Sequence, residues 1–132
     1  ISLRAEVDSY QGHLEVYNDV DIALDPFPYN GTTTTLEGLW MGVPIVTLCG
    51  DRHACRVGSS ILHRVGLDKL IANDFVSYVG IAQKLANDFS YMQSLRAGMR
   101  ERLRNSDLCK PQQFARDVEE SYLAMIAKSK PC

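Results

Sequence analysis

The sequence has little net charge and no long apolar run. Its 14 basic and 16 acidic residues leave a formal net charge of -2. These charges are interspersed, so they form no broad basic surface for a nucleic acid or an anionic membrane. No apolar segment approaches the roughly 20 residues that cross a bilayer, and no signal peptide is recognisable. We therefore expect a cytoplasmic protein with neither nucleic acid nor membrane among its partners.

Patterns typical of disulfides and metal sites are also missing. The four cysteines are Cys49, Cys55, Cys109 and Cys132. They are widely spaced and contain no C-x-x-C pair, as expected of reduced thiols in the cytosol. The three histidines form no H-x-x-x-H pattern with a nearby carboxylate. We therefore expect neither a bound metal nor a cofactor.

The length of the chain limits the number of its domains. With 132 residues and 45% hydrophobic content, the chain can bury one core of ordinary size but not two. We therefore expect a single domain over residues 1–132. The chain starts with Ile1 inside a strand-like segment, so we also expect it to be a piece of a longer polypeptide.

Hydrophobic periodicity and turn residues predict alternating strands and helices. Strands are expected at 1–8, 21–25, 44–48 and 69–72, and helices at 13–20, 32–41, 57–65, 74–87, 90–105 and 111–128. Gly42 and Gly66 are expected just past two of the helix ends. In the last helix, Phe114, Val118, Tyr122 and Met125 are expected to form one apolar stripe.

This alternation of strands and helices defines the predicted fold. A strand, a helix and a strand within about 30 residues form a β-α-β unit with parallel strands. We therefore predict an α/β fold, a Rossmann-like doubly wound parallel sheet with a helix-rich C-terminal end.

The segment after the strand at 21–25 contains the most informative motif. Gly31 is followed by four hydroxyl residues, Thr32 to Thr35, at the start of a helix. Free backbone N–H groups and the positive end of the helix dipole favour an anion there, such as a phosphate or diphosphate. No lysine follows the glycine as in a P-loop, and no G-x-G-x-x-G motif is present. A triphosphate with magnesium and a dinucleotide are therefore both disfavoured.

The same helix carries Glu37, for which two interpretations are open. Glu37 lies one turn from Thr33, so its carboxylate could accept hydrogen bonds from ribose hydroxyls beside a bound phosphate. Thr34 and Glu37 are also spaced as a capping box, in which both side chains satisfy the N–H groups of the helix itself. On spacing alone, the capping box is the commoner structure.

Residues 21–47 carry a resemblance to a known family. Their sequence, DIALDPFPYNGTTTTLEGLWMGVPIVT, is followed by GDRHACRVG and by LHRVGLDKLIA. Together they resemble the C-terminal catalytic half of the O-linked N-acetylglucosamine transferases, particularly bacterial relatives with tetratricopeptide repeats upstream. The resemblance covers nearly the whole chain. It implies the GT-B architecture, in which two Rossmann-like domains face each other and the C-terminal one holds most of a uridine diphosphate (UDP) sugar.

The resemblance also implies the reaction and its partners. The donor would be UDP-N-acetylglucosamine, and the reaction an inverting O-linked transfer to serine or threonine of a protein or peptide acceptor, without a bound metal. An N-terminal GT-B domain and tetratricopeptide repeats would belong to the same polypeptide. Acceptor contacts, the catalytic base and a lysine that holds the diphosphate would all lie outside this chain. The isolated chain is therefore expected to bind donor weakly and to be inactive.

Individual positions follow from the same resemblance. Gly31, Thr32, Thr33 and Thr34 would hold the diphosphate, Glu37 the ribose hydroxyls, and His13 would lie against the uracil ring. Animal relatives have histidine at the position of Thr32, so any role of that imidazole cannot be carried over. They have aspartate at the position of Glu37, and the longer carboxylate should still reach a diol. With the resemblance, we favour the ligand role of Glu37.

Two other functions remain possible on the sequence alone. One is a non-catalytic doubly wound module that binds a phosphorylated ligand or a protein. The other is a GT-B transferase that uses a different UDP-sugar, because the residues that select the sugar lie outside this chain.

Overall fold

A computed structural model describes residue 7 and residues 9–129 of the chain. The expected opening strand at 1–8 therefore lies outside the described residues, apart from Val7. Helices labelled η are 3-10 helices. The elements follow in the order α1 (Tyr10–Glu15), η1 (Val16–Asp19), β1 (Ala23–Leu24), α2 (Thr33–Trp40), β2 (Ile45–Leu48), η2 (His53–Cys55), α3 (Val57–Arg64), η3 (Asp68–Leu70), β3 (Ile71–Ala72), α4 (Phe75–Asn87), α5 (Phe89–Asn105), η4 (Asp107–Cys109) and α6 (Pro111–Ser129).

The described strands form a parallel sheet in the order β1-β2-β3. Ala23 pairs with Ile45, and Thr47 pairs with Ile71. The helices α2 and α3 make the two crossovers, so the predicted β-α-β units are present. All four residues of β2 are buried, as expected of a central strand. The expectation of a buried strand at 21–25 is wrong in part, because β1 has two residues and lies at the edge of the described sheet, where Leu24 is 57% exposed.

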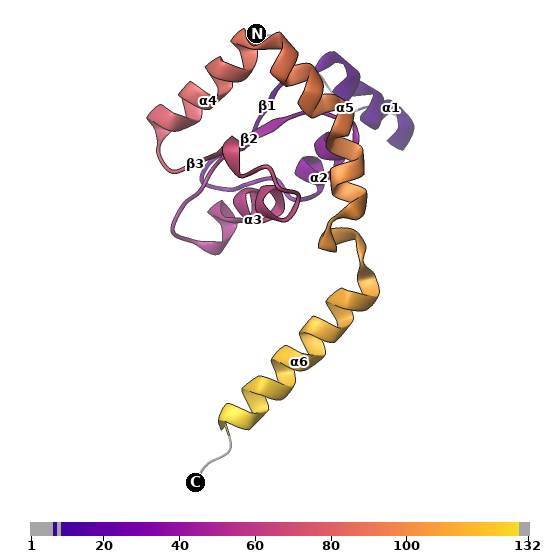
Figure 1. The fold of residues 1–132 in the computed structure, drawn as a ribbon, viewed down its shortest axis with the longest axis vertical. Helices are drawn as coiled ribbons and strands as arrows, with labels where there is room; N and C mark the ends of the chain where they lie inside the picture. The colour runs from indigo at the N-terminus through magenta and orange to yellow at the C-terminus, as the bar shows by residue number, and fades with distance from the viewer. Residues whose placement is uncertain (1–6, 8, 130–132) are drawn as a thin grey trace.

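Helices pack around this short sheet. In the view of Figure 1, α4 lies above the strands and α3 below them, while α5 runs down one side. The helices α2, α3 and α4 all contact β2, and α5 contacts both α2 and α4. The buried apolar residues form one core cluster, made of Leu39, Ile45, Val46, Ile61, Leu62, Val65, Leu67, Leu70, Leu85, Leu95, Met99 and Leu103.

Glycines end α2 and α3 as the sequence predicts. Gly42 has a φ of +79° and Gly66 a φ of +70°. After α2, the amide of Val43 donates to the carbonyl of Gly38 (2.8 Å), and the amide of Gly42 donates to that of Leu39 (3.1 Å). These two bonds form a Schellman motif, which satisfies the last carbonyls of the helix.

The last helix is present as expected, but its apolar stripe is exposed. Phe114, Tyr122 and Met125 are between 61% and 67% exposed. Figure 1 shows α6 projecting away from the remainder of the chain, and among the other elements it packs mainly against η4. Periodicity correctly indicated an amphipathic helix, but the described residues supply no surface that covers its apolar face. None of the described helices is long and apolar enough to span a membrane.

The left-handed conformation of Gly42 leads to a stability prediction. A Cβ in this region of φ and ψ costs roughly 1–2 kcal/mol, so Gly42→Ala should lower the free energy of unfolding by about that amount. Urea unfolding of the chain measures the change. Gly80→Ala is the matched control, because Gly80 lies inside α4 with open space around its Cα. The control should be neutral or stabilising by up to about 1 kcal/mol, and an equal loss in both variants would contradict the argument.

Candidate functional site

The loops that follow β1 and β2 meet at the carboxyl edge of the sheet, and Asn30 connects them. Its backbone amide donates to the carbonyl of Ala54 (2.9 Å), and its side-chain oxygen accepts the amide of Gly58 (3.3 Å). Its side-chain nitrogen donates to the carbonyl of Pro26 (3.0 Å). Asn30 is 2% exposed. Its buried side chain therefore fixes the loop that leads into α2.

A buried carboxylate lies directly beneath this loop. Asp25 is 4% exposed, and its two oxygens accept the backbone amide of Gly31 (2.8 Å) and the hydroxyl of Thr47 (2.6 Å). The hydroxyl of Tyr78 donates to the backbone carbonyl of Asp25 (2.8 Å). Burial raises the pKa of Asp25, and the bonds from Thr47 and Gly31 oppose that shift. Asp25 thus fixes the loop from the buried side, through its bond to the amide of Gly31.

The backbone amide of Gly31 is bonded to Asp25, so Gly31 contributes to the site through its lack of a side chain. Gly31 is among the residues expected to bind the diphosphate, but a diphosphate would have to compete with Asp25 for this N–H group. A Cβ on Gly31 would lie 2.5 Å from Oγ1 of Thr34 and 2.9 Å from Oγ1 of Thr35. Gly31 therefore provides the space in which the first turn of α2 closes over the loop.

The start of α2 has the features of an anion site. Thr32, Thr33 and Thr34 are exposed, whereas Thr35 is buried and its hydroxyl donates to the carbonyl of Gly31 (3.0 Å). The first helical hydrogen bond runs from the amide of Leu36 to the carbonyl of Thr32 (3.1 Å). The amides of the preceding turn have no acceptor within the helix, and they lie at the positive end of its dipole. An anion can bind to this turn from the solvent side.

The carboxylate of Glu37 does not cap the helix. The N-cap residue is Thr32, which makes no side-chain capping bond, and Thr34 already lies inside α2. Oε2 of Glu37 instead lies 3.0 Å from Nε2 of His13 and accepts the hydroxyl of Tyr17 at 3.3 Å. The capping-box interpretation is therefore wrong, because long-range partners from α1 and η1 engage the carboxylate.

His13 and Tyr17 complete this end of the site. The rings of His13 and Tyr17 meet edge to face, with centroids 5.8 Å apart. The side chain of His13 is 46% exposed and that of Glu37 is 13% exposed. The structure thus brings the side chains of His13 and Glu37 together. The sequence alone does not indicate the contact of Tyr17 with Glu37, since the two residues lie 20 positions apart.

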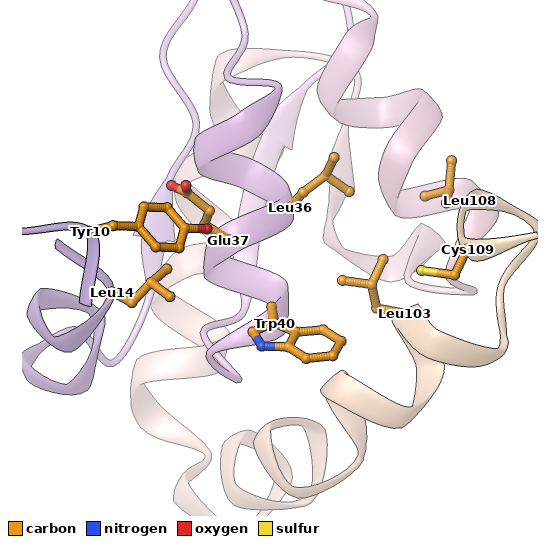
Figure 2. Close-up of a pocket in the computed structure, with 8 residues that line it drawn as sticks. All are labelled: Tyr10, Leu14, Leu36, Glu37, Trp40, Leu103, Leu108 and Cys109. Atoms are coloured by element: carbon orange, nitrogen blue, oxygen red, sulfur yellow. The ribbon is translucent and has the colours of Figure 1, made fainter. Parts of the chain in front are cut away.

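An apolar hollow of about 560 Å³ lies on the flank of α2. Figure 2 shows Leu36, Glu37 and Trp40 along α2, with Tyr10 and Leu14 on one side and Leu103, Leu108 and Cys109 on the other. This hollow is not the anion site, because none of Thr32, Thr33 and Thr34 lines it. Across the described part of the chain, no three His, Cys, Asp or Glu residues are grouped as metal ligands.

Comparisons with known proteins identify the family of this chain. The family model of glycosyl transferase family 41 matches residues 3–118. The chain belongs to glycosyl transferase family 41. The match extends over the sheet, the start of α2 and the partners of Glu37, so the site described above belongs to the part of the chain that defines the family.

Curated relatives carry matching names. The chain is 46% identical over 113 residues to the "Probable UDP-N-acetylglucosamine--peptide N-acetylglucosaminyltransferase SPINDLY" of Hordeum vulgare, and 47% identical to that of Petunia hybrida. It is 31% identical over 116 residues to the UDP-N-acetylglucosamine--peptide N-acetylglucosaminyltransferase of Caenorhabditis elegans. These alignments cover 86% to 88% of this chain but only 10% to 12% of the relatives.

A solved structure agrees with these relatives. A mutant of the Thermobaculum terrenum O-GlcNAc transferase superposes with a TM-score of 0.81 at 40% identity, over 89% of this chain and 22% of that one. The expected resemblance to the O-linked N-acetylglucosamine transferases is confirmed, and so is the Rossmann-like α/β fold of a GT-B glycosyltransferase. The chain spans about an eighth of the curated plant relatives it matches.

The buried carboxylate of Asp25 generates a prediction about pH. Because folding raises its pKa above the ordinary value of 3.8, the stabilising contribution is complete below that value and is lost as pH rises through the raised pKa. Asn at this position does not titrate. We expect the stability difference, defined as the free energy of unfolding of wild type minus that of Asp25→Asn, to decrease as pH rises above the ordinary value of 3.8 in urea titrations.

Asp74→Asn provides a control with the opposite sign. Bonds from the amide and hydroxyl of Ser77 lower the pKa of Asp74, so its contribution is present above the ordinary value and lost below it. The free energy of unfolding of wild type, minus that of Asp74→Asn, should therefore increase with pH. The same trend in both variants would contradict the burial of charge at Asp25.

Proposed function

We propose that this chain is the donor-binding part of an inverting glycosyltransferase that transfers N-acetylglucosamine from UDP-N-acetylglucosamine to serine or threonine of a protein or peptide acceptor. The names of the family 41 relatives support the donor and the acceptor. In this proposal the enzyme is cytoplasmic, and an N-terminal GT-B domain and tetratricopeptide repeats belong to the same polypeptide. The remainder of the polypeptide provides the catalytic base, the acceptor contacts and a lysine that holds the diphosphate, so the isolated chain binds donor weakly and is inactive.

The observation that carries the proposal is the placement of two different binding features on one helix. The exposed turn from Thr32 to Thr34 is suited to the diphosphate, because its amides and hydroxyls can donate to phosphate oxygens. Glu37 and His13 lie together one turn further along α2. Residues four positions apart are separated by about 6 Å along a helix axis. One bound nucleotide can therefore reach both groups, with its phosphates at the helix start and its nucleoside beside Glu37.

The same helix start can assist the chemical step. When the sugar leaves, negative charge develops on the departing diphosphate. Fixed N–H donors and the helix dipole stabilise that charge without reorganisation, because Asp25 and Asn30 hold the loop before the donor arrives. We propose that transfer proceeds in this way without a bound metal or cofactor.

Thr33→Glu in the full-length protein tests the proposed diphosphate site. A carboxylate at the first residue of α2 favours the helix through the dipole, but it repels a diphosphate at the same place. We expect the Kd for UDP, measured by calorimetry, to rise at least about tenfold, while the melting temperature without ligand stays the same or increases.

Gln83→Glu is the matched control, because it adds the same charge on an exposed position of α4. Its Kd for UDP should equal that of wild type. If wild type binds neither UDP nor UDP-N-acetylglucosamine, the chain is a non-catalytic module and the proposal fails. If Thr33→Glu binds UDP as wild type does, the diphosphate does not lie at the start of α2.

A further inference from the structure

We propose that Tyr17 is a positioning residue for the nucleoside end of the donor site, where it orients the carboxylate of Glu37 and the ring of His13. This inference rests on the proposed function, because it assumes that a nucleotide binds beside Glu37. Tyr17 lies in η1, outside α2. It contacts both residues that are expected to bind the nucleoside, His13 and Glu37.

The hydroxyl of Tyr17 ties η1 to α2 at two points. It lies 3.3 Å from Oε2 of Glu37 and 3.3 Å from the backbone carbonyl of Thr34. Its ring lies against Gly38, where an added Cβ would be 3.6 Å from Cε1 of Tyr17. The ring is therefore held in place by packing, and the hydroxyl is available to hold the carboxylate.

The bonds to Oε2 of Glu37 leave its other oxygen, Oε1, available to a ribose diol. His13 and Tyr17 both engage Oε2, and Oε1 has no partner among the described residues. A carboxylate with one oxygen fixed by the protein cannot rotate freely, so its second oxygen is oriented before a ligand arrives. Oε1 can then accept a hydrogen bond from a ribose hydroxyl.

The same tyrosine supports His13 from the side. The two rings meet at an interplanar angle of 88°, and the imidazole keeps 46% of its side-chain surface exposed. Edge-to-face contacts of this kind fix the relative orientation of two rings. The exposed part of His13 is thus held near Glu37, where a base attached to the bound ribose would lie.

Tyr17 remains a hydrogen-bond donor throughout the neutral range. Burial, and then the charge of the neighbouring Glu37 carboxylate, raise the pKa of Tyr17 to about 12. Its proton is therefore retained, and the bond to Glu37 keeps its direction.

Tyr17→Phe in the full-length protein tests this role, because it keeps the ring and removes only the hydroxyl. We expect the Kd for UDP to rise about fivefold to tenfold, and the Kd for inorganic pyrophosphate to stay unchanged. Wild type should prefer UDP over its 2′-deoxy or 3′-deoxy analogue, and Tyr17→Phe should lose most of that preference. Tyr10→Phe, at a position 70% exposed on the adjacent α1, should behave as wild type.

A double-mutant cycle with Glu37→Gln shows whether Tyr17 acts through Glu37. If it does, Tyr17→Phe should cause little further loss of ribose preference in the Glu37→Gln background. Additive losses, or an equal loss of UDP and pyrophosphate binding in Tyr17→Phe, would overturn the positioning role. If Tyr17→Phe keeps the wild-type ribose preference, the inference fails while the proposed function stands. If wild type does not bind UDP, the proposed function itself fails.

Discussion

The buried carboxylate of Asp25 is the constraint on which the site depends. A charge that is 4% exposed must be satisfied by donors, and here the donors are the amide of Gly31 and the hydroxyl of Thr47. This requirement fixes the distance between the end of β1, the middle of the sheet and the loop before α2. The first turn of α2 can then present its amides to solvent in a fixed direction. Asn30 reinforces the same loop with bonds to Pro26 and Gly58.

The arrangement separates structural polar groups from those available to a ligand. Asp25, Asn30, Thr35 and Thr47 are buried, and each is bonded within the protein. The exposed hydroxyls and the first-turn amides of α2 lie just above them. If a diphosphate binds as proposed, little rearrangement is needed to receive it, because the loop is already ordered when the chain folds. Gly31 has no side chain, which allows the exposed first turn of α2 to approach the buried polar groups.

Some apolar side chains of the chain are exposed. The apolar stripe of α6 is uncovered, and the relatives and the matched structure are several times longer than this chain. Trp40, at the side of the apolar hollow, is 40% exposed, and its ring lies 5.1 Å from the guanidinium of Arg100. The helix α6 projects away from the start of α2, whereas Trp40 lines the same hollow as Glu37.

Local patterns in the sequence determined the alternating elements, the helix ends at Gly42 and Gly66 and the exposed threonine turn, because periodicity and φ preference act over a few residues. Tertiary structure alone decided three points: Glu37 faces His13 and Tyr17 and does not cap its helix, the amide of Gly31 is bonded to Asp25, and α6 lies uncovered. The partners of Glu37 lie 20 and 24 positions away, and the position of the Asp25 side chain is set by Thr47, 22 positions away. These partners are chosen by packing of the whole chain, which spacing within one segment does not encode.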